Sequence, residues 1–235
     1  MMPPVLAIMA RAPSSPGKSR LIQELGTRDG ETLRGALLRD TFASVSRIDV
    51  QKAVLFTPPE HEAEIRALTP FPAVFLPQRG ATLGDRMYGG MGDLLGLGFG
   101  PVVMIGSDLP TLPSVHVSAA LDILARRPDA LVLGPAEDGG YYLIGVTRSH
   151  PRLFERIPWG TSQVFEHTCK AAEALGMTVE RLPQWYDVDS LSDLRRVGRG
   201  VAGAAGIARY TRTWLAAAPS DVHTRMDGAR MTGRS

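Results

Sequence analysis

The stretch Val102-Val103-Met104-Ile105-Gly106-Ser107-Asp108-Leu109-Pro110 joins a short apolar run to a polar loop. Its apolar residues are continuous rather than alternating, which is typical of a strand buried on both faces. Such strands belong to parallel sheets that helices cover on both sides. Ligands of open α/β sheets bind at the carboxyl ends of the strands, so the loop after this run is a candidate site.

The same pattern recurs along the chain, where short apolar runs alternate with amphipathic stretches of helical length. We predict strands at 5–10, 53–57, 73–76, 101–105, 130–133 and 141–146. We predict helices at 31–47, 60–68, 84–95, 114–127, 163–175 and 190–197. The sequence therefore predicts an α/β fold with a mostly parallel central sheet and helices on both faces.

The composition of the chain limits its class. Of its 235 residues, 44% are hydrophobic and 21% are charged, which excludes a collagen, a coiled coil and a wholly disordered chain. A single cysteine, Cys169, excludes an intramolecular disulfide and a thiolate metal site. No apolar run approaches the roughly 20 residues that span a bilayer, and the first ten residues lack the positive start of a signal peptide. We expect a cytoplasmic protein that does not bind membranes.

The positive net charge of +2 comes from the C-terminal part of the chain. Residues 1–198 carry 20 Lys and Arg against 22 Asp and Glu, whereas residues 199–235 carry 6 against 2. We expect one domain over 1–198, a helical extension over 199–218 and a flexible tail over 219–235. The aromatic residues near the C-terminal arginines, Tyr210 and Trp214, fall in the expected helix, so we expect no nucleic-acid binding.

A basic segment follows the first predicted strand. Arg11, Lys18 and Arg20 lie within ten residues of one another, and Gly17 allows close approach of the backbone to a ligand. Anions favour cationic side chains and helix N-termini, so the segment is a candidate phosphate-binding loop. A Walker A loop is a competing interpretation, but Ala12 replaces its first glycine and two prolines remove backbone donors. A solvated basic loop is the simpler alternative.

Aspartates follow the opening stretch and recur late in the chain. Asp108 directly follows a buried strand, where a carboxylate can bind a hard cation such as Mg²⁺ or Mn²⁺, although an ordinary turn explains it equally well. Asp187 and Asp189 project to the same side if their segment is extended. Asp189 or Ser190 also fits the N-cap of the following helix. A cap needs only one of these residues, so a second metal carboxylate stays open.

The segment Gly134-Pro135-Ala136-Glu137-Asp138-Gly139-Gly140-Tyr141-Tyr142-Leu143-Ile144-Gly145 joins the fifth predicted strand to the sixth. Its Asp-Gly and Gly-Gly dipeptides are hairpin signals and predict a small antiparallel element after the fifth strand. A turn does not explain the density of small residues around Tyr141 and Tyr142. That density suits a pocket floor, where backbone approaches a ligand that an aromatic side chain orients.

Seven segments together carry a resemblance to a known family. They are Pro16–Leu21, Leu76–Gly80, Leu83–Met87, Ile105–Pro110, Gly134–Gly145, Ile157–Thr161 and Trp185–Ser190. In order and content they resemble the bacterial DUF2064 family, also labelled radical-SAM/selenodomain-associated transferase 1, of the nucleotide-diphospho-sugar transferase superfamily. The resemblance covers about residues 5–197 and implies a single Rossmann-like domain of the GT-A fold. A looser similarity extends to the guanylyltransferases that act on phospholactate and on the molybdenum cofactor.

The resemblance implies a metal site and a nucleotide site. Asp108 and Asp189 match the two metal positions, with Asp187 as a weaker candidate for the second, and the expected metal is Mg²⁺ or Mn²⁺. The residues matched to the nucleotide are Arg11, Lys18 and Arg20 near the phosphates, and Gln78, Gly80 and Gly84 near the base.

The resemblance also implies an acceptor or sugar side. The residues matched to it are Asp138, Gly139, Gly140 and Tyr141. Three positions depart from the family pattern. Arg11 stands where the family more often has lysine, which keeps the charge but changes its geometry. Ser190 stands for threonine, and Gly160 replaces a serine and removes its hydroxyl, although Thr161 follows.

Two reactions share the electrostatic design that the resemblance implies. A divalent ion held by Asp108 and Asp189 would neutralise the charge of a leaving group, and Lys18 would add positive charge. Our first expectation is glycosyl transfer from a nucleotide-diphospho-sugar to a small acceptor, with Asp138 as the base. The alternative is nucleotidyl transfer from a nucleoside triphosphate to a small phosphorylated acceptor, which releases pyrophosphate and which the basic loop favours. A non-catalytic nucleotide-binding protein is a third hypothesis, against which the two aspartates argue.

Overall fold

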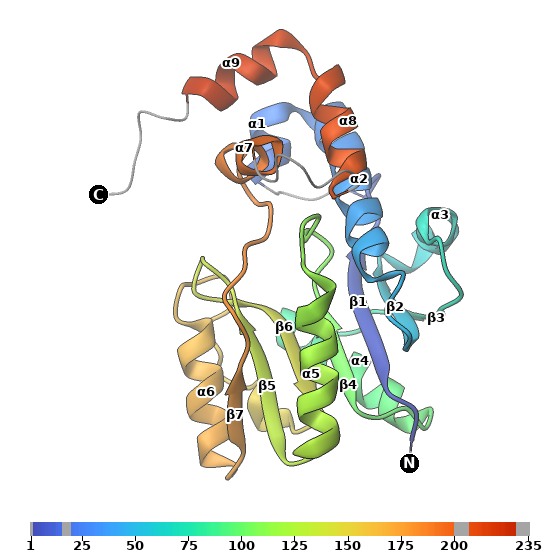
Figure 1. Ribbon diagram of the computed structural model, residues 1–235, viewed down its shortest axis with the longest axis vertical. Coiled ribbons are helices and arrows are strands. Elements are labelled where there is room, and N and C mark those ends of the chain that lie inside the picture. Colours follow the sequence, from blue (N-terminus) through green and yellow to red (C-terminus); the bar gives the residue numbers. More distant parts are fainter. Residues whose placement is uncertain (1, 16–19, 200–206, 229–235) are drawn as a thin grey trace.

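The computed structural model describes residues 2–15, 20–199 and 207–228, and these form a seven-stranded sheet with helices on both faces (Figure 1). The strands are β1 (Val5–Arg11), β2 (Gln51–Thr57), β3 (Val74–Pro77), β4 (Val102–Ile105), β5 (Ala130–Pro135), β6 (Tyr141–Val146) and β7 (Thr178–Arg181). Their order is β3-β2-β1-β4-β6-β5-β7, and β6 alone runs against the others. The predicted α/β class is therefore confirmed, including the antiparallel hairpin of β5 and β6.

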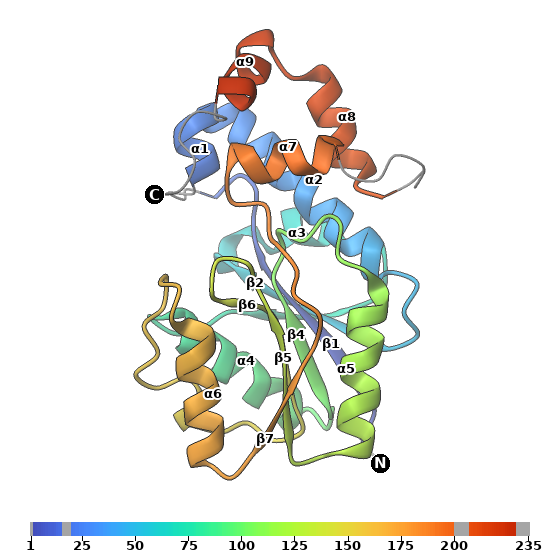
Figure 2. The ribbon, with the colours of Figure 1, turned by 60° about the vertical axis from the view of Figure 1, so that its left-hand side comes forward.

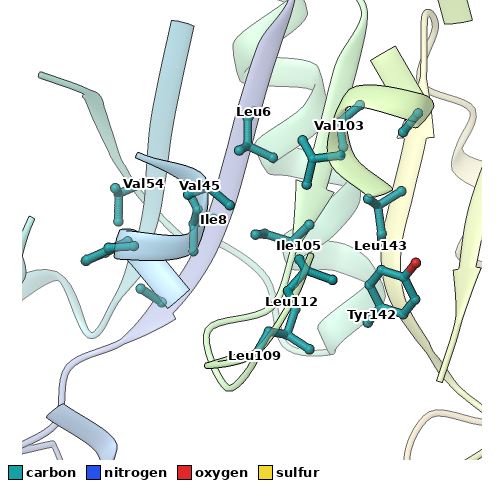
Figure 3. Close-up of a cluster of buried hydrophobic side chains, with 14 of the residues drawn as sticks. Leu6, Ile8, Val45, Val54, Val103, Ile105, Leu109, Leu112, Tyr142 and Leu143 are labelled. Atoms are coloured by element: carbon teal, nitrogen blue, oxygen red, sulfur yellow. The ribbon is translucent and has the colours of Figure 1, made fainter. Parts of the chain in front are cut away.

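The sheet has a hydrophobic core on each face because alternate residues of its central strands point to opposite sides. Leu6 and Ile8 of β1 belong to one core cluster, and their neighbours Val5 and Ala7 belong to the other. Figure 3 shows the first cluster, in which Leu6 and Ile8 lie beside Val103 and Ile105 of β4. Burial of both faces explains the continuous apolar runs of the sequence.

Different helices cover the two cores. The first core receives side chains from α2 (Thr27–Val45), α3 (Glu62–Leu68) and α5 (Ser114–Arg126). The second receives side chains from α4 (Leu83–Gly96) and α6 (Val164–Ala174). The remaining short elements of the body are α1 (Arg20–Leu25), the 3-10 turns η1 (Pro59–His61) and η2 (Pro151–Leu153), and α7 (Leu191–Arg199).

Two further helices, α8 (Arg209–Ala217) and α9 (Ser220–Gly228), pack with α1, α2 and α7 beyond one end of the sheet (Figure 2). The buried carboxylate of Asp40 on α2 accepts hydrogen bonds from the backbone N–H groups of Tyr210 and Thr211, at 3.0 and 2.7 Å. It thereby caps the start of α8 from a different helix.

The segment 219–235, expected to be a flexible tail, contains the helix α9 over most of its described length. Val222 and Met226 lie four residues apart, on one face of α9, and both are buried in the cluster that α7 and α8 complete. Two apolar positions do not make a periodic pattern, so the sequence did not predict this helix. None of the helices in the described ranges is long and apolar enough to span a membrane.

Candidate functional site

A pocket of about 420 Å³ opens at the carboxyl edge of the sheet. Arg11 ends β1, Thr57 ends β2, and Gln78 and Asp108 follow β3 and β4, and all four line the pocket. The chain turns back at the ends of these strands, so loops distant in sequence meet here. The other side of the pocket is formed by the β5–β6 hairpin, the loop before α6 and Asp187.

The structure brings together seven of the residues that the sequence predicted for the site. The predicted residues that line the pocket are Arg11, Gln78, Asp108, Asp138, Gly140, Tyr141 and the weaker metal candidate Asp187. The predicted residues that do not line it are Gly80, Gly84, Gly139 and Asp189. Lys18 lies outside the described residues, and so does the side chain of Arg20, whose backbone begins α1.

The loop that carries Asp108 is held from two sides. The buried hydroxyl of Thr41 on α2 donates to the carbonyl of Ser107, at 2.8 Å, and accepts from the N–H of Leu109, at 3.0 Å. On the other side, the carbonyl of Asp108 accepts a hydrogen bond from the N–H of Val188, at 2.9 Å. This bond brings the segment of Asp187 and Asp189 against Asp108, although about 80 residues separate them in sequence.

The hairpin that carries Asp138 is fixed to the same late segment. The N–H of Glu137 donates to the carbonyl of Trp185, at 3.1 Å, and the N–H of Trp185 donates to the carbonyl of Pro135, at 3.0 Å. Within the turn, Asp138 accepts a hydrogen bond from the N–H of Gly140, at 2.8 Å. These contacts place Asp138 on the same side of the pocket as Asp187.

Gly139 is required by this turn rather than by a ligand. Its φ of +90° is one that side-chain-bearing residues rarely adopt. A Cβ at this position would lie 2.2 Å from the carbonyl oxygen of Ser162. Gly84 has a comparable packing role, because a Cβ there would lie 2.8 Å from the Trp159 ring.

Four aspartates, Asp108, Asp138, Asp187 and Asp189, form a carboxylate cluster at the pocket. Asp108 is accessible from the pocket, but desolvation by the surrounding protein and the negative charge of Asp189 raise its pKa to about 6. The nearby Arg34 guanidinium opposes this rise. Desolvation raises the pKa of Asp187 to about 7, with further contributions from Asp138, Asp108 and Asp189. The carboxylates repel one another, and a cation between them would relieve that repulsion.

The carboxylate cluster fits a Mg²⁺ site that substrate phosphates and water complete. It does not fit a site in which the protein supplies all the ligands. No group of three or more His, Cys, Asp or Glu side chains within 2–15, 20–199 and 207–228 is arranged to hold a metal ion. Mg²⁺ is usually held by one or two carboxylates together with substrate phosphates and water, and dedicated protein cages are unusual for it. Asp108 with one late aspartate meets that requirement.

Arg34 holds the loop beside the site, a role that the sequence did not reveal. From the middle of α2 its Nη2 donates to the carbonyl of Ser15, at 2.8 Å, and to that of Pro13. Its pKa is lowered by burial and by the charge of Arg11, whereas Asp108 acts in the opposite direction. Arg34 therefore links the loop after β1 to the carboxylate cluster. An arginine within a helix carries no local signal that separates this role from an exposed polar face.

A second contact holds the same loop. The side chain of Glu64 on α3 accepts hydrogen bonds from the hydroxyl of Ser14 and from its N–H, the latter at 3.0 Å. Burial tends to raise the pKa of Glu64, but the bonds from Ser14 and His61 outweigh it and hold the pKa below its usual value. Glu64 therefore stays charged and anchors the start of the predicted phosphate-binding segment.

The rings of Tyr141 and Trp159 form an aromatic wall of the pocket. The rings of Tyr141 and Trp159 meet edge to face, with centroids 6.4 Å apart, and the Tyr141 hydroxyl lies 3.9 Å from the sulfur of Met87. Burial raises the pKa of Tyr141, so its hydroxyl stays protonated. The hydroxyl of its neighbour Tyr142 reaches instead to His116, at 2.9 Å. Tyr141 therefore lines the pocket with its ring, while its neutral hydroxyl is engaged by Met87.

A larger hollow of about 880 Å³ lies between α2, the start of α5 and residues 207–209. Two of the charged groups that line it, Arg196 and Asp40, are already engaged within the protein. Arg196 binds Glu137, at 2.8 Å, and lies over the Tyr186 ring, while Asp40 is occupied by the start of α8. The smaller pocket, where acidic and basic groups converge, is therefore the candidate functional site.

Several solved structures share this fold. A candidate nucleotide-diphospho-sugar transferase from Desulfovibrio desulfuricans G20 matches with a TM-score of 0.84 and 27% identity, covering 95% of this chain and 98% of its own. A 4-diphosphocytidyl-2C-methyl-D-erythritol synthase from Anaerococcus prevotii DSM 20548 matches with a TM-score of 0.55 and 11% identity, covering 91% of this chain and 96% of its own. A CMP:2-keto-3-deoxy-manno-octonic acid synthetase bound to CTP matches with a TM-score of 0.52 and 14% identity, covering 83% and 96%. The last two likenesses concern the fold alone.

Sequence comparison assigns the family. No curated protein matches the chain. The model of the family DUF2064, described as an uncharacterized protein conserved in bacteria, matches residues 38–161, which is more than half of the chain and includes Asp108 and Asp138. The chain belongs to the DUF2064 family.

Proposed function

We propose that this protein is a divalent-metal-dependent transferase that uses a nucleotide donor. The observation that carries the proposal is the convergence of Asp108, Asp138 and Asp187 with Arg11 in one pocket at the carboxyl edge of the sheet. Carboxylates suit a hard cation, and a guanidinium beside them suits the phosphates that such a cation binds. The name of the similar Desulfovibrio desulfuricans G20 protein, a candidate nucleotide-diphospho-sugar transferase, supports the same class.

In this proposal Asp108 and one of the late aspartates hold Mg²⁺ or Mn²⁺. After desolvation, the charge of Asp189 contributes most to the raised pKa of Asp108, whereas Asp187 lines the pocket itself. Both aspartates therefore fit the second metal-binding position. The bound ion would neutralise the charge that develops on the phosphate leaving group. Arg11, at the end of β1, binds the phosphates from the other side, together with Lys18 and Arg20 of the same segment.

Glycosyl transfer is the reaction that we place first. The aromatic wall of Tyr141 and Trp159 stands beside Asp138, and together they suit a sugar and the hydroxyl that attacks it. The acceptor oxygen bonds to the anomeric carbon while its proton passes to the Asp138 carboxylate. The bond from that carbon to the phosphate oxygen breaks, and the nucleoside diphosphate leaves with the bonding electrons.

Nucleotidyl transfer is the second candidate, and the arrangement around the β1 loop favours it. The positive charge of Arg11 lowers the pKa of Arg34, and Arg34 binds two carbonyls of the loop. Such a concentration of positive charge suits a triphosphate. An oxygen of the acceptor phosphate would bond to the α-phosphorus, and pyrophosphate would leave. An acceptor phosphate is already ionised, so this reaction needs no base.

The test separates the two reactions by their leaving groups. The full chain is incubated with nucleotide sugars or nucleoside triphosphates, small alcohols or phosphates as acceptors, and Mg²⁺ or Mn²⁺. Release of a nucleoside diphosphate supports glycosyl transfer, and release of pyrophosphate supports nucleotidyl transfer. Asp108→Asn should abolish either, whereas Asp122→Asn on the exposed surface of α5 should not. Nucleotide binding that needs no metal and survives Asp108→Asn would contradict the proposal.

A further inference from the structure

The larger hollow, of about 880 Å³, is separate from the candidate site. The described residues that line it include none of those that line the smaller pocket. It is bordered by α2, the start of α5 and residues 207–209 at the start of α8, and Figure 2 shows α2 and α8 packed beyond the start of α5. Sites for small organic molecules have volumes of about 300 to 1,000 Å³. The hollow is therefore large enough for a ligand of its own.

Apolar and aromatic side chains form much of the wall of this hollow. Val115 and Ile207 line it and are 63% and 40% exposed, which is unusual for large aliphatic residues. The rings of Trp185 and Tyr186 also line it and stack on each other, with centroids 5.6 Å apart. The hydroxyl of Thr111 donates to that of Tyr186, at 3.1 Å, and so restrains the ring. Such a wall suits the apolar body of a ligand.

The charges at the hollow are mainly positive. Its charged lining residues in the described ranges are three arginines and one aspartate, namely Arg47, Arg196, Arg209 and Asp40. The carboxylate of Asp40 is buried and accepts hydrogen bonds from the start of α8, and Arg196 forms an ion pair with Glu137. The carboxylates beside the hollow are thus already occupied, whereas two of the arginines have no acidic partner.

Arg47 and Arg209 are these two arginines, and both are exposed. Arg47 makes no hydrogen bond, ion pair or ring contact within residues 2–15, 20–199 and 207–228. Arg209 donates to the hydroxyl of Tyr210 and lies over its ring, 4.4 Å from the centroid, and both of these partners are uncharged. The hollow therefore presents two guanidinium groups whose charges no carboxylate of the described chain neutralises.

We propose that this hollow is a second ligand site, which binds a small organic anion. The ligand has an apolar body and one carboxylate, sulfonate or phosphate group. Its anionic group binds Arg47 and Arg209, because guanidinium groups form charge-assisted hydrogen bonds with such oxygens. Its body covers Val115, Ile207 and the Trp185 ring. This site goes beyond the proposed function, since it requires neither the carboxylate cluster nor a nucleotide.

Both parts of the ligand are needed for binding. A bare anion meets the two arginines at an exposed position, where solvent and salt weaken the attraction. A neutral apolar molecule gains the contacts with the wall but forms no charge-assisted hydrogen bond with Arg47 or Arg209. An amphipathic anion gains both contributions at once, so it should bind about tenfold or more tightly than its uncharged analogue.

The test uses two fluorescent probes that differ in one charged group. The full chain is titrated with 8-anilinonaphthalene-1-sulfonate, whose aromatic body carries a sulfonate, and with N-phenyl-1-naphthylamine, which lacks the sulfonate. We expect the sulfonate to bind saturably, with one dye per chain, and the uncharged dye to bind about tenfold or more weakly. Equal affinities, or no saturable binding of the sulfonate, would overturn the inference.

Substitutions then place the bound dye in the hollow. Arg47→Gln should weaken binding of the sulfonate about tenfold and leave the uncharged dye nearly unchanged. Arg126→Gln is the matched control, because Arg126 is exposed in the last turn of α5, at the other end of that helix from the hollow. Ser44→Trp, on the face of α2 that lines the hollow, should fill the space and weaken both dyes.

Binding of the sulfonate in the smaller pocket is the main competing outcome, and Arg11→Gln detects it. If Arg11→Gln weakens the sulfonate and Arg47→Gln does not, the dye lies in the smaller pocket and the inference is overturned. The same conclusion follows if Arg47→Gln and Arg126→Gln bind the sulfonate equally well. Either result leaves the proposed function standing, because that function is tested by its own leaving groups.

Discussion

Replacing Asp187 with asparagine removes one negative charge from the carboxylate cluster and keeps the shape of the side chain. Folding raises the pKa of Asp187 from 3.8 to about 7, so the folded protein holds this proton more tightly than the unfolded chain does. The stability that this group contributes is complete below about pH 4 and is lost as the pH rises through about 7. Asp187→Asn should therefore stabilise the metal-free protein at pH 8 and have little effect at pH 4.

The size of the effect follows from the same pKa. At about 1.4 kcal/mol per pKa unit, a rise from 3.8 to about 7 corresponds to about 4 kcal/mol. Asp187 is only half-buried and shares the repulsion with three other carboxylates, so solvent screening and coupling reduce this value. We expect Asp187→Asn to raise the free energy of unfolding by about 1–2 kcal/mol at pH 8.

The assay is urea unfolding of the full chain at pH 4, 5.5, 7 and 8 in the presence of a chelator. Asp122→Asn, on the exposed surface of α5, should leave the midpoint unchanged at every pH. Adding Mg²⁺ at pH 8 should then stabilise the unsubstituted protein more than Asp187→Asn, because the ion offsets a repulsion that the variant has already lost. If Asp187→Asn and the unsubstituted protein had equal urea midpoints at all four pH values, the proposed repulsion within the carboxylate cluster would be refuted. A variant less stable than the unsubstituted protein at pH 8 would refute it as well.

Three further substitutions test how the site and the C-terminal helices are built. Gly139→Ala should lower the free energy of unfolding by about 2–4 kcal/mol, because φ is +90° and the new Cβ meets the Ser162 carbonyl. Gly140→Ala is the control, and equal melting temperatures for the two variants would contradict this expectation. Asp40→Ala should lower the free energy of unfolding by about 2 kcal/mol, because backbone donors at the start of α8 lose their acceptor. Asp40→Asn keeps one acceptor oxygen and should recover part of the lost stability. Equal urea midpoints for the two variants would argue against the cap. Arg34→Gln should weaken nucleotide binding about tenfold in calorimetry, because it releases the β1 loop and removes a charge. Arg34→Lys should restore the charge but not the bonds to the loop. Unchanged affinity in both variants would exclude a role of Arg34 in nucleotide binding.

The strands could be predicted because burial on both faces leaves a continuous apolar run in the sequence. β7 was missed for the complementary reason. Thr178–Arg181 is a short edge strand that pairs with β5, and its side chains are exposed or half-buried. A strand of this kind is stabilised by backbone pairing to its neighbour, which leaves no apolar pattern. The insertion of β6 between β4 and β5 was hidden as well, because strand order depends on contacts between distant segments.

Some residues of the candidate site were also predictable from the sequence, and others were not. Asp108 and Asp138 were predictable because each stands in a turn directly after a buried strand, where side chains face the pocket edge. Asp187 was the weaker candidate in the sequence, but the bond from the N–H of Val188 to the carbonyl of Asp108 places it in electrostatic contact with Asp108. Arg34 had no signal at all, because its partners are carbonyl oxygens of a loop about 20 residues away.

By itself the sequence determined the α/β class, the mostly parallel sheet, and the edge at which acidic and basic residues gather. It could do so because hydrophobic periodicity and turn chemistry are local properties of the chain. Only the tertiary structure decided which aspartates repel one another and which arginine supports the β1 loop. These features depend on distances between residues that are far apart in sequence, and such distances exist only once the sheet has formed.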